Sequence, residues 1–310
     1  MNGRTHSDDG LCTTTAEGQN TRGDPRGGDG RASSTPEGQD MQRPDWAPET
    51  IDIERPSVAR MYDYYLGGSH NFAADRAAAR AMVEAVPEAP LMAQANRAFL
   101  RRAVQYLAGT GVRQFLDIGS GIPTVGNVHE IAQGIDRESR IVYVDVDPVA
   151  VAHSQEILAG NERATVLQED LRNPEAILAH PEVTRLLDFT QPVAVMVVAV
   201  LHFIPDTDRP EEILRTLRAA LAPGSHLVLS QASEDGRAGT GERAEAERVY
   251  RRTDSQLWIR SRAELTALFD GFELVDPGVV WVPQWRPDSP DQAENAERAV
   301  FMGGVGRLGG

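Results

Sequence analysis

The spacing of apolar residues divides the chain into a helical part and a later part in which strands and helices alternate. Residues 71–87 and 90–109 carry apolar side chains at helical intervals, and Leu100, Val104 and Leu107 form one stripe in the second range. Further along, short apolar runs typical of strands alternate with helical patterns. The predicted strands are 113–118, 140–145, 164–168, 193–201 and 226–231.

The order of these elements predicts the fold class. Alternating strands and helices are typical of a doubly wound, mostly parallel sheet with right-handed crossovers. The nearly all-apolar run at 193–201 indicates a central strand that is covered on both faces. The β-type runs at 272–283 and 298–305 have no long helix between them, so we expect an antiparallel strand at the C-terminal end. The sequence therefore predicts an α/β, Rossmann-like sheet of seven strands.

Three segments differ in composition and pattern. Residues 1–48 are rich in Gly, Ser, Thr, Asp, Arg and Pro and contain few large apolar residues, so we expect a disordered tail. Residues 49–110 are predicted to form a helical lid or cap, in which Asn71 would cap a helix at its N-terminus and Pro87 would end it. Residues 111–310 are predicted to form the α/β domain.

Charge and cysteine content limit the partners and the compartment. The net charge of −15 disfavours broad binding to nucleic acid or to an anionic membrane. A single cysteine, Cys12, excludes a disulfide framework within the chain. We see no signal-peptide pattern and no apolar run near the roughly 18 residues of a membrane span. We therefore expect a cytoplasmic protein with no nucleic-acid or membrane partner; the histidines show no metal-ligand spacing, so no metal is expected.

Three acidic residues stand at the ends of successive predicted strands: Asp117, Asp145 and Asp170. In open α/β sheets, ligands bind beyond the carboxyl ends of the strands. Gly119 and Gly121 directly follow Asp117, and residues without a Cβ atom allow the backbone to turn and to approach a ligand closely. The sequence therefore predicts a ligand site that these five residues share.

The residues around the glycines favour one adenosine-bearing cofactor over others. A Walker A loop is excluded because no Gly-Lys-Ser/Thr follows, and a dinucleotide fingerprint would have a third glycine where Thr124 stands. Asp145 can accept hydrogen bonds from ribose hydroxyls, as in any adenosine site. Asp170 can accept from the adenine amino group, which leaves Asp117 and the glycine turn for an amino-acid moiety. This set suits S-adenosylmethionine better than NAD.

Several motifs resemble a known enzyme family. The segments FLDIGSGIPT, VYVDVDPVAVAHS, LQEDLRNPEAIL and VAVMVVAVLHFIPD resemble the successive motifs of class I S-adenosylmethionine-dependent methyltransferases. The segments RPSVARMYDYYLGGSHNFAADR and ANRAFLRRAVQYL are similar to an S-adenosyl methyltransferase family of high-GC bacteria, long catalogued as a domain of unknown function. This resemblance covers roughly residues 53–308.

The resemblance implies cofactor contacts for residues at the ends of four predicted strands. It places Asp117, Gly119, Ser120 and Gly121 around the methionine moiety, Asp145 at the ribose, Val146 at the adenine face, Asp170 and Leu171 at the adenine edge, and Ala199 and Val200 at the sulfonium end.

The segment RMYDYYLGGSHNF precedes the first long helical run. In this fold class, the segment ahead of the first strand commonly folds over the cofactor. We predict that residues 62–71 form a lid that turns at Gly67 and Gly68. The lid residues expected to contact cofactor or substrate are Tyr62, Tyr65, His70 and Asn71.

Methyl transfer is an in-line displacement, so the main task of the enzyme is to place the nucleophile. A base is needed only where an O–H or N–H nucleophile must lose a proton, and His202 is the best-placed candidate because an ordinary histidine pKa is about 6.5. Tyr65, from the lid, is the second candidate catalytic residue. The acceptor is expected to be a small molecule, such as a secondary metabolite.

Other functions are compatible with parts of the pattern. No Asp/Asn-Pro-Pro-aromatic motif of amino-directed DNA methylation follows the fourth predicted strand, and cytosine C5 methylation would need a cysteine outside the predicted tail. A cofactor-binding protein without catalysis remains an alternative. An NAD-dependent oxidoreductase is a further alternative, against which Thr124 and Asp170 argue.

Overall fold

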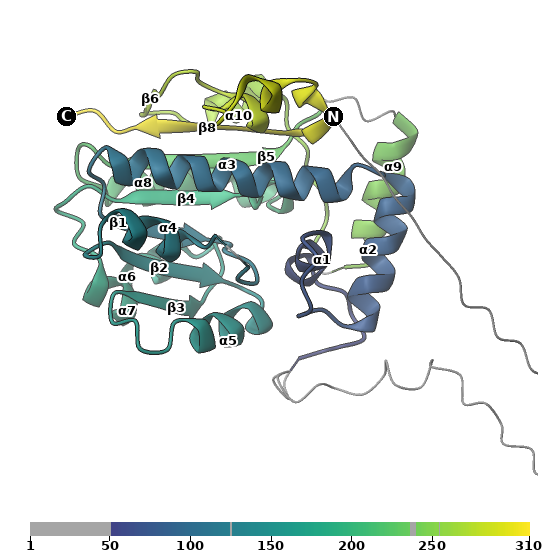
Figure 1. The fold of residues 1–310 in the computed structure, drawn as a ribbon, viewed down its shortest axis with the longest axis horizontal. Helices are drawn as coiled ribbons and strands as arrows, with labels where there is room; N and C mark the ends of the chain where they lie inside the picture. The colour runs from purple at the N-terminus through teal and green to yellow at the C-terminus, as the bar shows by residue number, and fades with distance from the viewer. Residues whose placement is uncertain (1–50, 125, 236–239, 254) are drawn as a thin grey trace, which may run out of the picture. The chain divides into compact units, whose positions relative to one another are not determined.

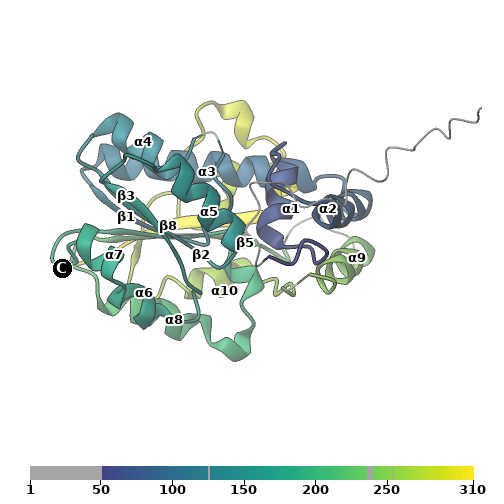
Figure 2. The ribbon, with the colours of Figure 1, turned by 90° about the horizontal axis from the view of Figure 1, so that it is seen from below.

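Eight strands form one sheet within the part of the chain that the structure describes, and helices cover both faces of this sheet (Figures 1 and 2). The computed structural model describes residues 51–124, 126–235, 240–253 and 255–310, so the tail expected at 1–48 lies outside the described residues. The strands are β1 (Gln114–Ile118), β2 (Arg140–Asp145), β3 (Ala164–Gln168), β4 (Ala194–Val198), β5 (His226–Ala232), β6 (Glu273–Leu274), β7 (Val280–Trp281) and β8 (Phe301–Arg307).

The strand order confirms the predicted fold class. The order is β3-β2-β1-β4-β5-β8-β6, with β7 also paired to β8. Strands β1 to β5 are parallel, and β8 runs antiparallel to β5, as the C-terminal β-type runs predicted. The predicted number of seven strands is one too few. A strand of two residues, such as β6 or β7, is too short to show the alternating pattern by which strands are recognised.

Along the chain, three helices precede β1 and the other described α-helices lie between strands. They are α1 (Val58–Tyr65), α2 (Ala73–Ala85), α3 (Ala89–Gly109), α4 (Val128–Ile135), α5 (Pro148–Ile157), α6 (Pro174–Ala179), α7 (Pro181–Leu186), α8 (Pro210–Ala219), α9 (Thr240–Tyr250) and α10 (Arg262–Ala267). Proline opens α5, α6, α7 and α8, where its missing N–H is harmless. None of the described helices has the length and apolar character that a membrane span requires.

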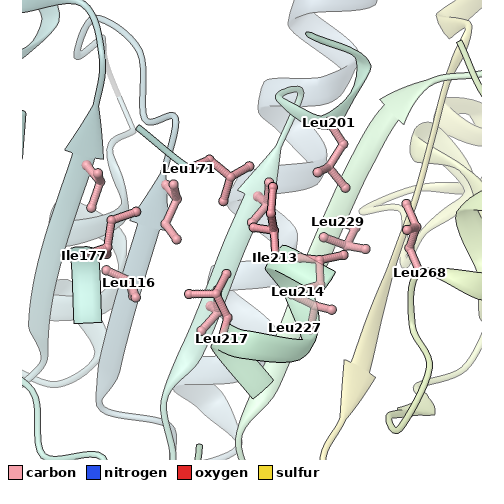
Figure 3. Packing of buried hydrophobic residues seen from close by; sticks show 14 of the residues in the cluster. Leu116, Leu171, Ile177, Leu201, Ile213, Leu214, Leu217, Leu227, Leu229 and Leu268 are labelled. Carbon is pink, nitrogen blue, oxygen red and sulfur yellow. The ribbon is translucent and has the colours of Figure 1, made fainter. Parts of the chain in front are cut away.

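Two apolar cores fill the space between the sheet and its helices. Leu116 and Ile118 of β1 pack on the side of α6, α7, α8 and α10, which Figure 3 shows from close by. Phe115 packs on the opposite side, with α3 and α4. Successive side chains of a strand point to opposite faces, so Asp117 lies on the same face as Phe115. The alternation thus places a carboxyl group under α3 at the end of β1.

A third apolar cluster joins helices that are far apart in the sequence. It contains Met61 and Tyr65 from α1, Met82 from α2, Ala93 from the start of α3, and Val249 from α9. Figure 1 shows α1, α2 and α9 grouped beside the sheet. We call α1, α2, the first turns of α3, and α9 the cap.

The cap differs from the lid expected at 49–110. The later part of α3, including Phe99 and Leu107, belongs to the core on one face of the sheet. Helix α9 follows β5 in the sequence and nevertheless packs on α2. Periodicity in a single segment does not reveal which distant helix will cover its apolar face, so the sequence alone gave no indication of α9 as a partner.

The Gly67–Gly68 turn is organised by one buried carboxylate. Asp63 is 2% exposed, and its Oδ2 accepts hydrogen bonds from the backbone N–H of His70 (3.0 Å) and the side-chain amide of Asn71 (2.8 Å). The backbone N–H of Gly68 donates to the carbonyl oxygen of Asp63 (2.9 Å). Gly67 has φ +80°, in the left-handed region that favours glycine. The turn predicted from the glycines is therefore present.

Asn71 serves this turn and not the start of α2. Its amide also donates to the carbonyl oxygen of Gly68 (3.0 Å). The N-cap residue of α2 is Phe72, whose backbone N–H donates to Oδ2 of Asp75 at 2.7 Å. The predicted N-cap is thus wrong by one residue, because the Asn71 side chain is already engaged by Asp63.

We expect Gly68→Ala to lower the free energy of unfolding by about 2 to 3 kcal/mol, the range for forcing extra atoms into a packed site. An added Cβ atom would lie 1.9 Å from Oδ1 of Asp63, and this carboxylate is held by its other hydrogen bonds. Urea denaturation measures the change. Gly134→Ala is the matched control, because a Cβ atom there, within α4, meets no atom within 4 Å. The control is expected to stabilise by up to about 1 kcal/mol; equal stability of Gly68→Ala and the wild type would contradict the account of the turn.

Candidate functional site

A cavity of about 650 Å³ lies at the carboxyl ends of the strands and is lined by the sheet and by the cap. Most residues predicted for the site line it together. They are Asp117, Gly119, Ser120, Gly121, Asp145, Val146, Asp170, Leu171, Ala199, Val200, His202, Tyr62 and Tyr65. His70 and Asn71 are not among the lining residues. The expected contacts of His70 and Asn71 with a ligand therefore find no support, whereas the three strand-end carboxylates share one cavity as predicted.

The glycine turn after β1 is held from both sides. Gly119 has φ +74°, and a Cβ atom there would lie 2.2 Å from Cγ2 of Val200, so only glycine allows Val200 to pack so closely. Gly121 has φ +67°, and its backbone N–H donates to Oδ2 of Asp145 at 2.6 Å. Asp145 therefore fixes the turn in addition to lining the cavity.

Burial keeps two carboxyl groups of the site partly protonated near neutral pH. Burial raises the pKa of Asp117 to about 7, Arg97 opposes this shift, and Asp145 adds to it. Burial also raises the pKa of Asp145 to about 6, against hydrogen bonds from the backbone N–H groups of Asp147 and Gly121. Asp117 accepts no hydrogen bond from the described residues. A cationic group placed beside Asp117 would therefore be strongly favoured.

Arg97 of α3 lines the cavity together with Asp117, and its charge acts on this carboxyl group. Arg97 was not among the predicted site residues. Its Nη2 donates to Oδ1 of Asn127 at 2.9 Å, which fixes the guanidinium group. Its Nε is buried and has no hydrogen-bond partner among the described residues, and the same is true of the hydroxyl oxygen of Ser120. Both residues line the cavity. Two unused donors beside a glycine turn are suited to an anionic group.

The sequence does contain a signal for Arg97. Arg97 lies three residues before Leu100 and seven before Val104, so it is on the same helix face as the apolar stripe. A charged residue on the face of a helix that packs against the sheet has to find a partner or a ligand there.

The far end of the cavity is suited to a planar polar group. The Nε of Arg172 donates to Oδ1 and Oδ2 of Asp170, each at 3.0 Å. Although burial raises the pKa of Asp170, the hydrogen bonds from Arg172 outweigh it and the pKa lies below its usual value. Asp170 thus remains an ionised hydrogen-bond acceptor. Val146 is 57% exposed and offers an apolar surface at the same end.

A buried polar network ties the cap to the sheet beside Asp145. The Ser57 hydroxyl and Nη1 of Arg60 both donate to Oδ2 of Asp147, the latter at 3.4 Å. The Nε of Arg60 donates to Oδ2 of Asp75 in α2 at 2.9 Å. The other oxygen of Asp147 caps α5 by accepting from the backbone N–H of Val149. This network explains the residues Arg-Pro-Ser-Val-Ala-Arg ahead of the tyrosines, because they attach α1 to the start of α5.

At the end of β4, Ala199 has φ +59° and directs the chain from the sheet to the short 3-10 helix Leu201–Phe203. His202 is 4% exposed and lines the cavity. Burial, helped by the charge of Arg260, lowers the pKa of His202 to about 3. The general-base role was expected from an ordinary pKa, and the structure removes that premise, since a group with this pKa is a weak base at neutral pH.

The two tyrosines of the lid differ in how their hydroxyls are used. The Tyr62 hydroxyl donates to the carbonyl oxygen of Ala93 (2.9 Å) and accepts from the amide of Asn96 (3.1 Å). The Tyr65 hydroxyl is buried, faces that of Tyr250, and makes no hydrogen bond of ordinary geometry with a described residue. Tyr62 is thus a structural residue whose ring borders the cavity, and Tyr65 retains an unused hydroxyl.

Comparison with protein families matches residues 44–309 to the model described as S-adenosyl methyltransferase. The chain belongs to this family. Two solved structures are similar to this chain over most of their length. A proposed methyltransferase from Thermobifida fusca YX has 38% identity and a TM-score of 0.80, over 86% of this chain and 100% of its own. A DUF574 family protein from Streptomyces avermitilis MA-4680 has 40% identity and a TM-score of 0.79, over 83% and 99%. The curated proteins gave no match.

The cavity of this chain fits the cofactor that its family implies. An amino acid is a zwitterion, and the cavity offers Asp117 for an ammonium group and the unused donors of Arg97 and Ser120 for a carboxylate. Asp145 and Asp170 are acceptors for ribose hydroxyls and an adenine amino group, and Val146 is an apolar surface for the ring. The match rests on complementary donors, acceptors and charges of side chains that the structure brings to one cavity.

Proposed function

We propose that this protein transfers a methyl group from S-adenosylmethionine to a small-molecule acceptor. The observation that carries the proposal is the pair of opposite charges, Asp117 and Arg97, which line one cavity together with the glycine turn. Together they complement the amino and carboxyl groups of the cofactor. The cavity volume of about 650 Å³ falls within the range of roughly 300 to 1,000 Å³ that is usual for small-molecule sites.

The side chains of the site would hold and orient the two reactants. S-adenosylmethionine supplies a methyl group on a positively charged sulfur. Asp117 and Arg97 would hold the amino-acid end, and Asp145 and Asp170 would hold the nucleoside. The turn at Ala199 and Val200 would border the sulfur, and the cap would exclude water and hold the acceptor in line with the methyl group.

The low pKa of His202 bears on the kind of acceptor. A neutral imidazole can orient a nucleophile by one hydrogen bond, but it removes a proton poorly. The acceptor atom would therefore be one that carries a free lone pair or ionises readily by itself. His202 then acts as a positioning residue.

We expect isothermal titration calorimetry to show binding of S-adenosylhomocysteine to the wild type and no binding of NAD. Asp145→Asn is expected to weaken binding at least about tenfold, since it removes a charged acceptor of the ribose hydroxyls and loosens the turn at Gly121. Asp270→Asn is the matched control, because the Asp270 side chain is 83% exposed and does not line the cavity. Binding of NAD in preference to S-adenosylhomocysteine would overturn the proposed function, and so would binding of neither compound.

A further inference from the structure

Two buried polar atoms, on cavity-lining residues outside the set that fits the cofactor, make no hydrogen bond of ordinary geometry with a described residue. They are the hydroxyl oxygen of Tyr65 and Nδ1 of His202, on residues that are 8% and 4% exposed. The hydroxyl of Tyr250 is the polar neighbour of the Tyr65 hydroxyl. Both residues line the cavity, one from α1 and the other from the turn after β4. Buried polar groups in native proteins are nearly always hydrogen-bonded, and an exception at a cavity indicates a ligand. These two atoms therefore mark a second binding region.

The walls of this region are apolar and aromatic. Lining side chains come from α2, α9, residues 201–205 and residues 255–258, and the large ones are Met82, Tyr250, Phe203 and Trp258. Among these described lining residues none carries a carboxylate, a guanidinium or an ammonium group. Trp258 is 38% exposed, so one large aromatic surface remains open at the edge of the cavity. Aromatic and thioether surfaces favour flat apolar ligands.

His202 is held as a neutral, oriented ring. Phe203 packs against it with ring centroids 4.2 Å apart, and Phe301 meets it edge-on at 5.4 Å. Arg260 donates to the carbonyl oxygens of Leu201 (2.8 Å) and Ile204 (2.9 Å), which places its positive charge beside the histidine and disfavours protonation of the ring. A neutral imidazole nitrogen can pair with a hydroxyl group. The residues named for this region offer no cation to a carboxylate, and the nearby Arg55, which also lines the cavity, donates to the carbonyl oxygen of Thr253 (3.3 Å).

Tyr65 is the hydroxyl donor of the region. Tyr62 is fully engaged with Ala93 and Asn96, so it has no donor to offer. Burial raises the pKa of Tyr65 and, to about 12, that of Tyr250, so both hydroxyls keep their protons at neutral pH. A protonated phenol and a neutral imidazole together are complementary to a ligand group that both accepts and donates a hydrogen bond.

We propose that the methyl acceptor is an uncharged, flat, mainly apolar molecule with a hydroxyl group, and that Tyr65 and His202 are the positioning residues that bind this hydroxyl. That this ligand is the methyl acceptor rests on the proposed function, whereas its binding does not. The ligand class is defined by a flat apolar shape, the absence of charge and one hydroxyl group. It excludes acidic peptides, nucleic acids and free carboxylic acids from this region.

The test uses the full-length protein and three two-ring probes of similar size, whose fluorescence reports binding. 2-Naphthol can donate and accept a hydrogen bond, 2-methoxynaphthalene can only accept one, and 2-naphthoate carries a negative charge. Each is titrated with and without saturating S-adenosylhomocysteine. We expect 2-naphthol to bind about tenfold more tightly than 2-methoxynaphthalene, the difference for one hydrogen bond, and 2-naphthoate to bind at least about 100-fold more weakly than 2-naphthol.

His202→Phe removes the acceptor of the ligand hydroxyl, so it is expected to remove the tenfold preference for 2-naphthol and to leave the affinity for 2-methoxynaphthalene unchanged. Tyr65→Phe removes the donor to the ligand oxygen, so it is expected to weaken the binding of both probes about tenfold. Tyr64→Phe is the matched control, because Tyr64 is the neighbouring tyrosine of α1 and does not line the cavity. Unchanged S-adenosylhomocysteine affinity shows that each variant is folded.

Two results would overturn the inference. One is the absence of 2-naphthol binding up to about 1 mM, the limit of weak specific affinity. The other is unchanged binding in the variants, in which the preference for 2-naphthol survives His202→Phe and the affinity for both probes survives Tyr65→Phe. The probes are also titrated without S-adenosylhomocysteine, so these results test the inference even if S-adenosylhomocysteine does not bind. Failure of S-adenosylhomocysteine to bind would contradict only the proposed function.

Discussion

Replacing Arg97 with methionine is expected to weaken S-adenosylhomocysteine binding about 100-fold and to leave 5′-methylthioadenosine binding unchanged. The two ligands share adenosine and a thioether, but only the first has an amino-acid end. Nε of Arg97 has no partner among the described residues, and Nη2 is fixed by Asn127, so the guanidinium group is ready to receive a carboxylate. Removing one member of a buried charge pair costs about 2 to 5 kcal/mol, which is more than tenfold in affinity.

Calorimetry with both ligands separates this role from a structural one. Arg101→Met is the matched control, since Arg101 lies on the same helix and pairs at the surface with Asp288. It should change neither affinity. An equal loss of both ligands in Arg97→Met would show that Arg97 maintains the shape of the cavity and does not bind a carboxylate.

The affinity for S-adenosylhomocysteine is expected to fall as the pH drops below 7. An ammonium group next to Asp117 favours the ionised carboxylate, so the bound state has the lower pKa. The free carboxyl, with a pKa of about 7, must then lose its proton when the ligand binds at lower pH. Affinity is therefore full above pH 7 and falls about tenfold for each pH unit below it, which gives about 100-fold between pH 8 and pH 5. Asp145, with a pKa of about 6, adds a second loss below pH 6 if the ribose requires its ionised form.

The controls for this pH dependence are one variant and one ligand. Asp117→Asn is expected to bind more weakly at pH 8, because the amide carries no charge, and to lose the slope between pH 7 and pH 6. 5′-Methylthioadenosine lacks the ammonium group and is expected to show no dependence on Asp117. The measurement is a calorimetric series in buffers of different ionisation enthalpy, which counts the protons released. Release of no proton at pH 6 by the wild type would contradict the assignment of Asp117.

The sheet and its carboxylates could be predicted because local patterns encode them. Each apolar run was long enough to indicate a strand, and the acidic residue at its end followed from chain order alone, as for Asp145 after 140–145. The neighbours of each strand in a doubly wound sheet follow from general connection rules. The sequence was therefore sufficient to predict that Asp117, Asp145 and Asp170 lie at the edge formed by the carboxyl ends of the strands.

Features that depend on distant packing could not be predicted. Helix α9 joins the cap through contacts with α2, and the five strands β1 to β5 separate these two helices in the sequence. Asn71 was expected at the ligand because it is polar and lies in a specific motif, but Asp63 captures its amide. The pKa of His202 depends on burial and on Arg260, and Arg260 belongs to a segment that follows β5. In each case the partner is a residue whose proximity only the folded chain establishes.

The two-part construction of the cap has a consequence for how the cavity can be altered. The carboxylates of the cavity lie on strand ends, whereas α1, α2 and α9 build the cap, and α9 follows β5 in the chain. Substitutions at Tyr250 and in residues 255–258 change the lining of the cavity without touching β1, β2 or β3. One short stretch of the chain can thus reshape the cavity while the strand-end carboxylates stay in place.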